Sequence, residues 1–110
     1  MNVNFNGYGE NVATFIAEGS VSVGAPVKIS GDGTVSACSS GDKFCGICLA
    51  VRDGYASVQL SGYISVSTTS KISVGYQTIS AGANGKVTAS DTGREYLVVD
   101  STATTAGIIL

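Results

Sequence analysis

The chain has 110 residues, a formal net charge of −2, and only 13% charged residues. Its six Lys and Arg residues stand singly along the sequence, whereas phosphate binding needs them clustered. Composition therefore predicts no nucleic-acid partner and no attraction to an anionic membrane surface.

The length indicates a single domain, and the composition indicates that it is all-β. Gly, Ser, Thr and Val are abundant, strong helix formers are scarce, and there is no His or Trp. The N-terminus lacks the cationic start and apolar core of a signal peptide, and no apolar run approaches the length of a membrane span. We therefore expect assembly in a cytoplasm, where cysteines remain thiols.

The N-terminal 18 residues are predicted to form an extended arm with the first strands, followed by a β-barrel domain over residues 19–110. In the arm, Val3 and Phe5 alternate with asparagines until Gly7-Tyr8-Gly9 breaks the pattern. Residues 12–17 form a second apolar stretch. Two interpretations of the arm remain open: an edge strand of its own domain, or a strand added to a neighbouring molecule.

The next segments predict strands joined by tight turns. Gly31-Asp32-Gly33 is typical of a turn, and we expect it to join residues 27–29 and 34–37 as a hairpin. Residues 44–51 form the most continuously apolar run, which predicts a strand buried on both faces. Arg52-Asp53-Gly54 predicts the next turn.

The clearest pattern covers residues 55–66, where apolar residues and Gly alternate with Tyr, Ser and Gln without error. This period of two predicts a strand with one buried face. A straight strand of that length would span about 36 Å, too long for a globule of this size. We therefore expect a bend, with Gly62 as the corner.

The C-terminal third continues the same plan. Asn84-Gly85 is a strong hairpin signal after the weak strand pattern of residues 74–79, and residues 86–88, 95–99 and 108–110 are strand-like. In all we expect seven to nine short strands, which is typical of a small β-barrel or β-sandwich.

Cys38, Cys45 and Cys48 are the residues most suggestive of chemistry. A zinc site would need a fourth ligand, and the sequence has no His and no second C-x-x-C pair. A redox pair would need its first Cys at a helix N-terminus, whereas this pair lies in an apolar strand pattern that would point the two sulfurs to opposite faces. Buried structural thiols are the favoured interpretation, while a disulfide involving Cys38 and a metal or redox role remain open.

Catalytic machinery is not predicted, and neither is a cofactor, a metal or a small-molecule substrate. Without His there is no conventional Ser-His or Cys-His pair. The four aspartates Asp32, Asp42, Asp53 and Asp91 stand in Gly-containing turns, where Asp is favoured for its own backbone chemistry. Tyr55 and Tyr63, on the polar side of the alternating strand, predict either cross-strand packing or an interface.

Several motifs follow one another in an order that resembles a known family. They are Gly24-Ala25-Pro26-Val27-Lys28-Ile29, Gly31-Asp32-Gly33-Thr34-Val35, Gly41-Asp42-Lys43-Phe44-Cys45-Gly46-Ile47-Cys48, Ala56-Ser57-Val58-Gln59-Leu60-Ser61-Gly62-Tyr63-Ile64 and Tyr96-Leu97-Val98-Val99. Over residues 20–110 the chain resembles small bacteriophage head-decoration, or capsid cement, proteins. The arm and the C-x-x-C pair lie outside this resemblance.

The resemblance implies a structural virion protein on the capsid exterior, assembled in the host cytoplasm. Its partner would be the major capsid protein, and its own state a homo-oligomer, with a trimer favoured. Many copies on a lattice would gain strength by multivalency. The candidate interface residues are Val3, Phe5, Tyr8, Tyr55 and Tyr63. Two alternatives remain: a virion surface module that binds host carbohydrate or protein, and a thiol enzyme using Cys45 and Cys48.

Overall fold

The computed structural model describes residues 11–110, which form ten strands and one short 3-10 turn. The strands are β1 (Asn11–Glu18), β2 (Pro26–Gly31), β3 (Thr34–Ala37), β4 (Gly46–Arg52), β5 (Tyr55–Ser61), β6 (Tyr63–Ser67), β7 (Gly75–Ala81), β8 (Val87–Ala89), β9 (Arg94–Ser101) and β10 (Thr105–Ile109). The 3-10 turn η1 (Ala83–Gly85) lies between β7 and β8. Residues 11–110 contain no helix that is long and apolar enough to cross a membrane. The all-β prediction is confirmed.

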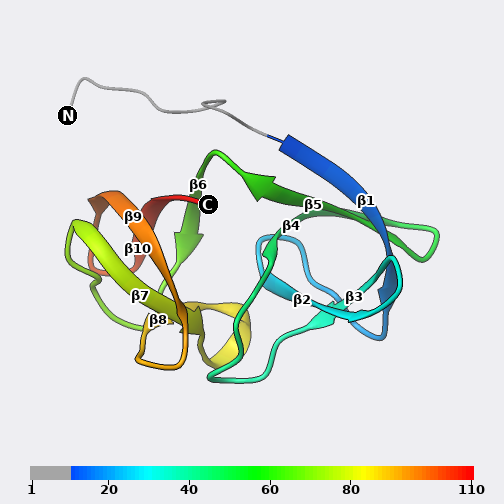
Figure 1. Cartoon of the computed structure of the whole chain (residues 1–110), viewed down its shortest axis with the longest axis horizontal. Helices are drawn as coiled ribbons and strands as arrows, with labels where there is room; N and C mark the ends of the chain where they lie inside the picture. Colours follow the sequence, from blue (N-terminus) through cyan, green and yellow to red (C-terminus); the bar gives the residue numbers. More distant parts are fainter. Residues whose placement is uncertain (1–10) are drawn as a thin grey trace.

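The first five strands close into a barrel in the order β1-β3-β2-β4-β5, which forms the right half of Figure 1. Closure comes from β1, which pairs in parallel with β3 and antiparallel with β5. The interior is filled by small and β-branched side chains, namely Val27, Val35, Cys48, Ala56 and Val58. Residues 11–18 of the predicted arm are thus a strand of the barrel, whereas residues 1–10 lie outside the described residues.

The last five strands form an antiparallel sheet in the order β6-β10-β9-β7-β8, in the left half of Figure 1. Its two edge strands approach each other through a parallel bridge between Thr68 and Val87. The sheet therefore curls around a second core, which also takes two residues from the barrel half of the chain. This core contains Phe44, Ile47, Val66, Ile72, Ile79, Val87, Tyr96, Val98, Ala106 and Ile108.

The alternating run at residues 55–66 bends at Gly62, as predicted, where φ is +88°. The bend separates β5 from β6, and the two strands belong to different sheets. That division raises the number of strands to ten, above the seven to nine expected. The prediction that only the apolar side of this run is buried is wrong at Gln59, which lies on the polar side and is only 2% exposed. Its Nε2 donates to the carbonyls of Ser61 and Tyr63, at 3.0 and 2.9 Å, on either side of the bend.

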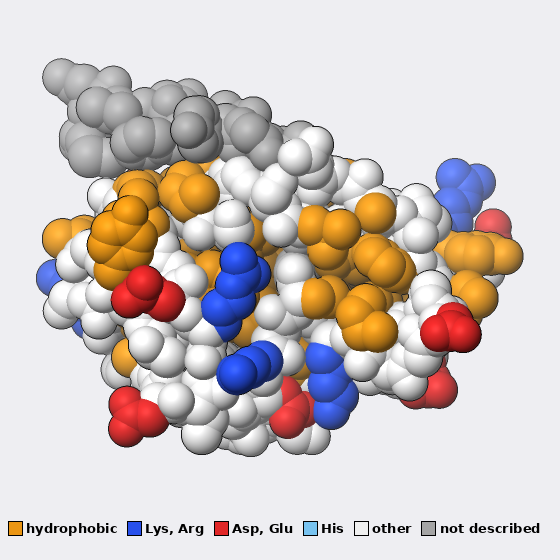
Figure 2. Space-filling view, in the orientation of Figure 1, with side chains coloured by type: hydrophobic (Ala, Val, Ile, Leu, Met, Phe, Trp, Pro, Cys, Tyr) orange, Lys and Arg blue, Asp and Glu red, His pale blue; other side chains and the backbone are white. Residues whose placement is uncertain are grey.

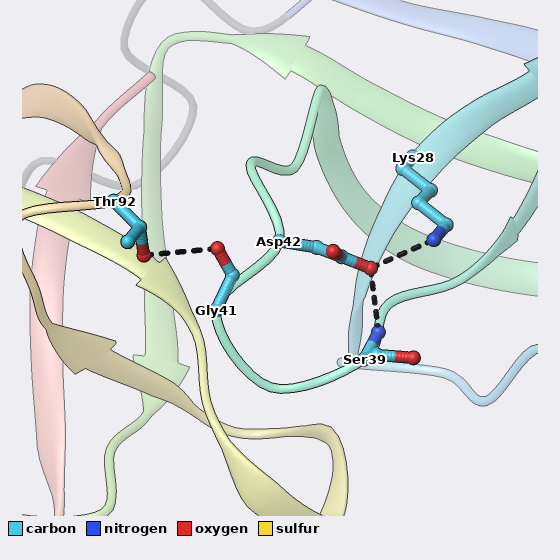
Figure 3. Close-up of polar contacts among 5 residues, drawn as sticks. All are labelled: Lys28, Ser39, Gly41, Asp42 and Thr92. Carbon is cyan, nitrogen blue, oxygen red and sulfur yellow. Dashed lines mark hydrogen bonds and ion pairs between the residues drawn. The ribbon is translucent and has the colours of Figure 1, made fainter.

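The loop between β3 and β4 fastens the two halves together (Figure 3). The Asp42 carboxylate accepts from Lys28 Nζ at 2.7 Å and from the Ser39 backbone N–H at 2.8 Å, so the loop is anchored to β2 of the barrel. On its other side, Thr92 Oγ1 donates to the Gly41 carbonyl at 3.0 Å. The Gly41 N–H also donates to the carbonyl of Ala81 in β7 at 2.8 Å.

The same loop delivers Phe44 into the core of the second sheet. The Phe44 ring stacks on Tyr96 with centroids 5.1 Å apart, and the Tyr96 hydroxyl donates to the Phe44 carbonyl at 3.1 Å. The strand predicted over residues 44–51 begins only at Gly46, and its burial ends after Cys48. Val51 is 41% exposed, so the prediction of burial on both faces holds for only the first part of β4.

The predicted turns are confirmed where glycine or a short polar side chain takes a left-handed conformation. The hairpin of β2 and β3 turns with Gly33 at φ +61°. The turn between β4 and β5 contains Asp53 at φ +52° and Gly54 at φ +80°. Asn84 at φ +59° lies in the connection between the antiparallel strands β7 and β8, where the sequence predicted a hairpin.

Candidate interaction faces

The structure places the predicted interface residues on separate surfaces. Tyr55 begins β5 on the barrel, whereas Tyr63 begins β6 on the second sheet. Val3, Phe5 and Tyr8 lie outside the described residues. Figure 2 shows apolar side chains gathered in two separate groups, one over each half of the molecule, with Lys and Arg side chains between them. The two tyrosines are therefore not brought together into one site.

The outer surface of β1 and β5 forms the first exposed apolar patch, which we call the barrel face (Val12, Ile16 and Tyr55). Ile16 is paired with Tyr55 in the sheet register, and their exposed fractions are 51% and 55%. Val12, four residues before Ile16 on the same side of β1, is 49% exposed. These residues point outward because their neighbours Phe15 and Ala17 pack against the barrel core. The sequence showed residues 12–17 only as an apolar stretch, so it did not single out Val12 and Ile16.

An open hollow lies beside this face and crosses β1, β5 and β4. It is lined by Thr14, Ala50, Arg52, Asp53, Tyr55 and Ser57. Two other described hollows are lined by no aromatic side chain. Recognition of carbohydrate would use several aromatic rings around a groove, so these three hollows give that alternative no support.

A row of apolar side chains crosses the outside of the second sheet and forms a second face, the sheet row (Tyr63, Ile109, Leu97 and Tyr76). The register pairs Tyr63 with Ile109, Ile109 with Leu97, and Leu97 with Tyr76, on four successive strands. The adjacent residues in these strands, such as Ile108, fill the core on the other side. Tyr76 is 70% exposed, and the other three are half-buried.

The Tyr63 ring lies over β10 at Gly107, which leaves room because it has no side chain. A Cβ built on Gly107 would collide with the Tyr63 ring and with a carboxylate oxygen of Asp100. The Tyr63 hydroxyl lies 3.4 and 3.3 Å from the two oxygens of that carboxylate. Burial and the nearby Asp100 charge raise the pKa of Tyr63. The ring therefore occupies the space that a side chain at position 107 would need, and this contact has a structural role.

The three cysteines are free thiols, so the disulfide alternative is not realised. Cys48 is buried in the barrel core and Cys45, which precedes β4, packs against the same core. Cys45 lies outside β4, so the regular-strand argument for opposite faces does not apply to this pair. Burial raises the pKa of all three thiols, to about 11 for Cys38. Raised pKa values disfavour the thiolate that a redox or nucleophilic cysteine requires.

Comparison with solved structures shows a similar fold in a bacteriophage protein. The N base of the head fiber gp8.5 of bacteriophage phi29 superposes with a TM-score of 0.65 over 92% of this chain and 93% of that chain, at 15% sequence identity. No protein-family model matches the sequence, and no curated protein sequence matches it. At this level of identity the likeness shows a shared fold, an all-β architecture that extends over nearly the whole of both chains.

Proposed function

We propose that this chain is a structural virion protein that decorates a phage capsid from outside and stabilises it by binding the major capsid protein. The observation that carries the proposal is the shared fold, over 92% of the chain, with the base of a phage head fiber. The order of motifs over residues 20–110 supports it independently. Such a role requires a rigid scaffold and a protein-facing surface, and no catalysis.

The barrel face is the surface we propose for the capsid contact. Ile16 and Tyr55 form an uncharged cross-strand pair that is about half exposed. Tyr is enriched at protein interfaces because its ring buries a large area at a small entropic cost. Because β1 and β5 belong to a closed barrel, little backbone order has to be acquired on binding. A modest contact in each copy is sufficient when many copies bind one lattice.

Binding to phage heads tests this function directly. Heads purified without the protein are mixed with the purified chain, and occupancy is measured by sedimentation and cryo-electron microscopy. Wild-type chain should bind at regular lattice positions, and Tyr55→Ser should bind about tenfold more weakly, as removal of an interface Tyr costs on the order of 1–2 kcal/mol. Tyr76→Ser, at another exposed Tyr on the second sheet, is the matched control and should bind as wild type.

Failure of the wild-type chain to bind heads, together with its absence from purified virions by mass spectrometry, would contradict the proposal. Equal weakening by Tyr55→Ser and Tyr76→Ser would reject the barrel face as the contact but not the virion role. Light scattering tests the proposed trimer, which should have three times the 11.0 kDa mass of one chain. A monomer in solution, together with isolated single copies in the density on heads, would reject the trimer.

A further inference from the structure

We propose that the hollow beside the barrel face is a groove that receives an apolar side chain of the major capsid protein, while a carboxylate of the same capsid segment pairs with Arg52. This inference rests on the proposed function and names the chemistry of the partner at that contact. It also adds β4 to the contact, a strand that contributes no residue to the barrel face. The lengths of the side chains around the hollow and the free donors of Arg52 carry the inference.

Short side chains on three neighbouring strands form the floor of the groove. Ser57 of β5 is paired with Thr14 of β1 on one side and with Ala50 of β4 on the other. These three residues form a row that is two inter-strand spacings long, about 10 Å. They line an open hollow with a volume of about 370 Å³. Because this volume is near the lower limit for ligand pockets and the hollow is open, it suits side chains of another protein better than an enclosed small molecule.

Longer side chains in the next cross-strand row form a wall of the groove. Tyr55 of β5 is paired with Ile16 of β1 and with Arg52 of β4. Ile16 and Tyr55 are about half exposed, and the Arg52 side chain is 91% exposed. Residues on one side of a strand follow one another at about 7 Å, so this row borders the floor directly. Val12 of β1 stands on the opposite side of the floor and is also about half exposed.

Arg52 provides a positive charge at the β4 end of the wall. Its Nε lies 3.8 Å from Oδ2 of Asp53, which is beyond hydrogen-bond distance, and within residues 11–110 its guanidinium makes no hydrogen bond. The planar donors of a guanidinium match a carboxylate in a bidentate pair. Asp53 lies in the turn after β4, and at protein interfaces Arg is enriched whereas Asp is depleted. The group that meets this end of the groove is therefore a carboxylate.

The spacing between the floor and Arg52 fits one extended segment of the partner. Arg52 and Ser57 are diagonal neighbours on β4 and β5, about 7–8 Å apart. In an extended chain, residues two positions apart project to the same side and are about 7 Å apart. An apolar residue over Ser57 and an Asp or Glu two positions away therefore reach the groove and the guanidinium together. The apolar contact supplies attraction, and the charge pair fixes the register of the segment.

A substitution that fills the groove tests its role in head binding. Ser57→Tyr should weaken binding to heads, measured by sedimentation, by about tenfold, because the partner's side chain can no longer enter. Thr78→Tyr, two residues from Tyr76 on the outer side of β7, is the matched control and should bind as wild type. Circular dichroism verifies that both variants fold. If folded Ser57→Tyr bound as tightly as wild type, the groove would be rejected, and head binding by the wild-type chain would still support the proposed function.

Substitution of two adjacent charges tests the carboxylate. Arg52→Gln should weaken head binding by about threefold and make it less sensitive to salt, because one charge pair is lost. Asp53→Asn should bind as wild type, since Asn tolerates the left-handed conformation at φ +52°. Weakening by Asp53→Asn alone would show that the partner presents a cation, and no effect of Arg52→Gln would reject the pairing. Failure of the wild-type chain to bind heads would overturn this inference together with the proposed function.

Discussion

Replacing Gln59 by Met tests how the two halves of the fold are joined. The Gln59 side chain is 2% exposed and donates two hydrogen bonds, to the carbonyls of Ser61 and Tyr63. These carbonyls flank Gly62, where the chain leaves the barrel and enters the second sheet. Met is similar in length and apolar, so the substitution removes the donors and preserves most of the packing.

The expected cost follows from the two lost bonds. A net contribution of about 1 kcal/mol for each bond, with a further penalty for partly buried carbonyls that lose a donor, lowers the free energy of unfolding by about 2–3 kcal/mol. For a domain of 110 residues this corresponds to a fall in Tm of about 10 °C. The bend should loosen, so hydrogen exchange should increase most at the end of β5 and the start of β6.

Urea and thermal unfolding monitored by circular dichroism measure this effect. Gln77→Met is the matched control, because Gln77 is half-buried on β7 and distant in sequence from the bend. It should change the free energy of unfolding by less than about 0.5 kcal/mol. If Gln59→Met were as stable as wild type, the two hydrogen bonds would not hold the bend, and the reasoning would be refuted.

Three further perturbations have definite expected outcomes. Gly46→Ala should lower the free energy of unfolding in urea by about 3 kcal/mol or more, because its Cβ would collide with the β5 backbone, which cannot move aside. Gly107→Ala should lower it less, because its Cβ displaces only the ends of side chains. Equal losses in the two variants would contradict this reasoning. The Cys38 thiol, with a pKa of about 11, should react slowly with a disulfide reagent at pH 8 and faster in urea; fast labelling of the folded chain would revive a thiol role. The hydrogen bond from Lys28 lowers the pKa of Asp42 in the folded chain. The pair therefore stabilises the fold fully at pH values above the pKa that this carboxyl has in the unfolded chain. The stabilisation is lost as the pH falls through the lower pKa of the folded chain. Asp42→Asn should therefore flatten the acid limb of the stability curve, and an unchanged limb would exclude the pair as its cause.

Local sequence pattern determined the class of fold and most of its turns. The strict alternation at residues 55–66 could only be satisfied by extended chain with one apolar side. Gly62 could be predicted as the corner because a straight strand over these residues would be longer than a domain of this size. Likewise, Gly33 and Asp53-Gly54 occupy left-handed conformations that few other residues adopt without strain. These features depend on neighbours within a few residues, so the sequence alone reveals them.

Which strands became neighbours was decided by the tertiary structure. The parallel pair of β1 and β3, the separation of β5 from β6 and the transfer of Phe44 into the second core all join residues that are distant in sequence. The burial of Gln59 is another case, because only the fold places carbonyls around its amide. The two apolar faces arise in the same way, from side chains on different strands. Periodicity shows that a side chain lies on one side of a strand, but pairing and packing decide whether that side meets a core or solvent.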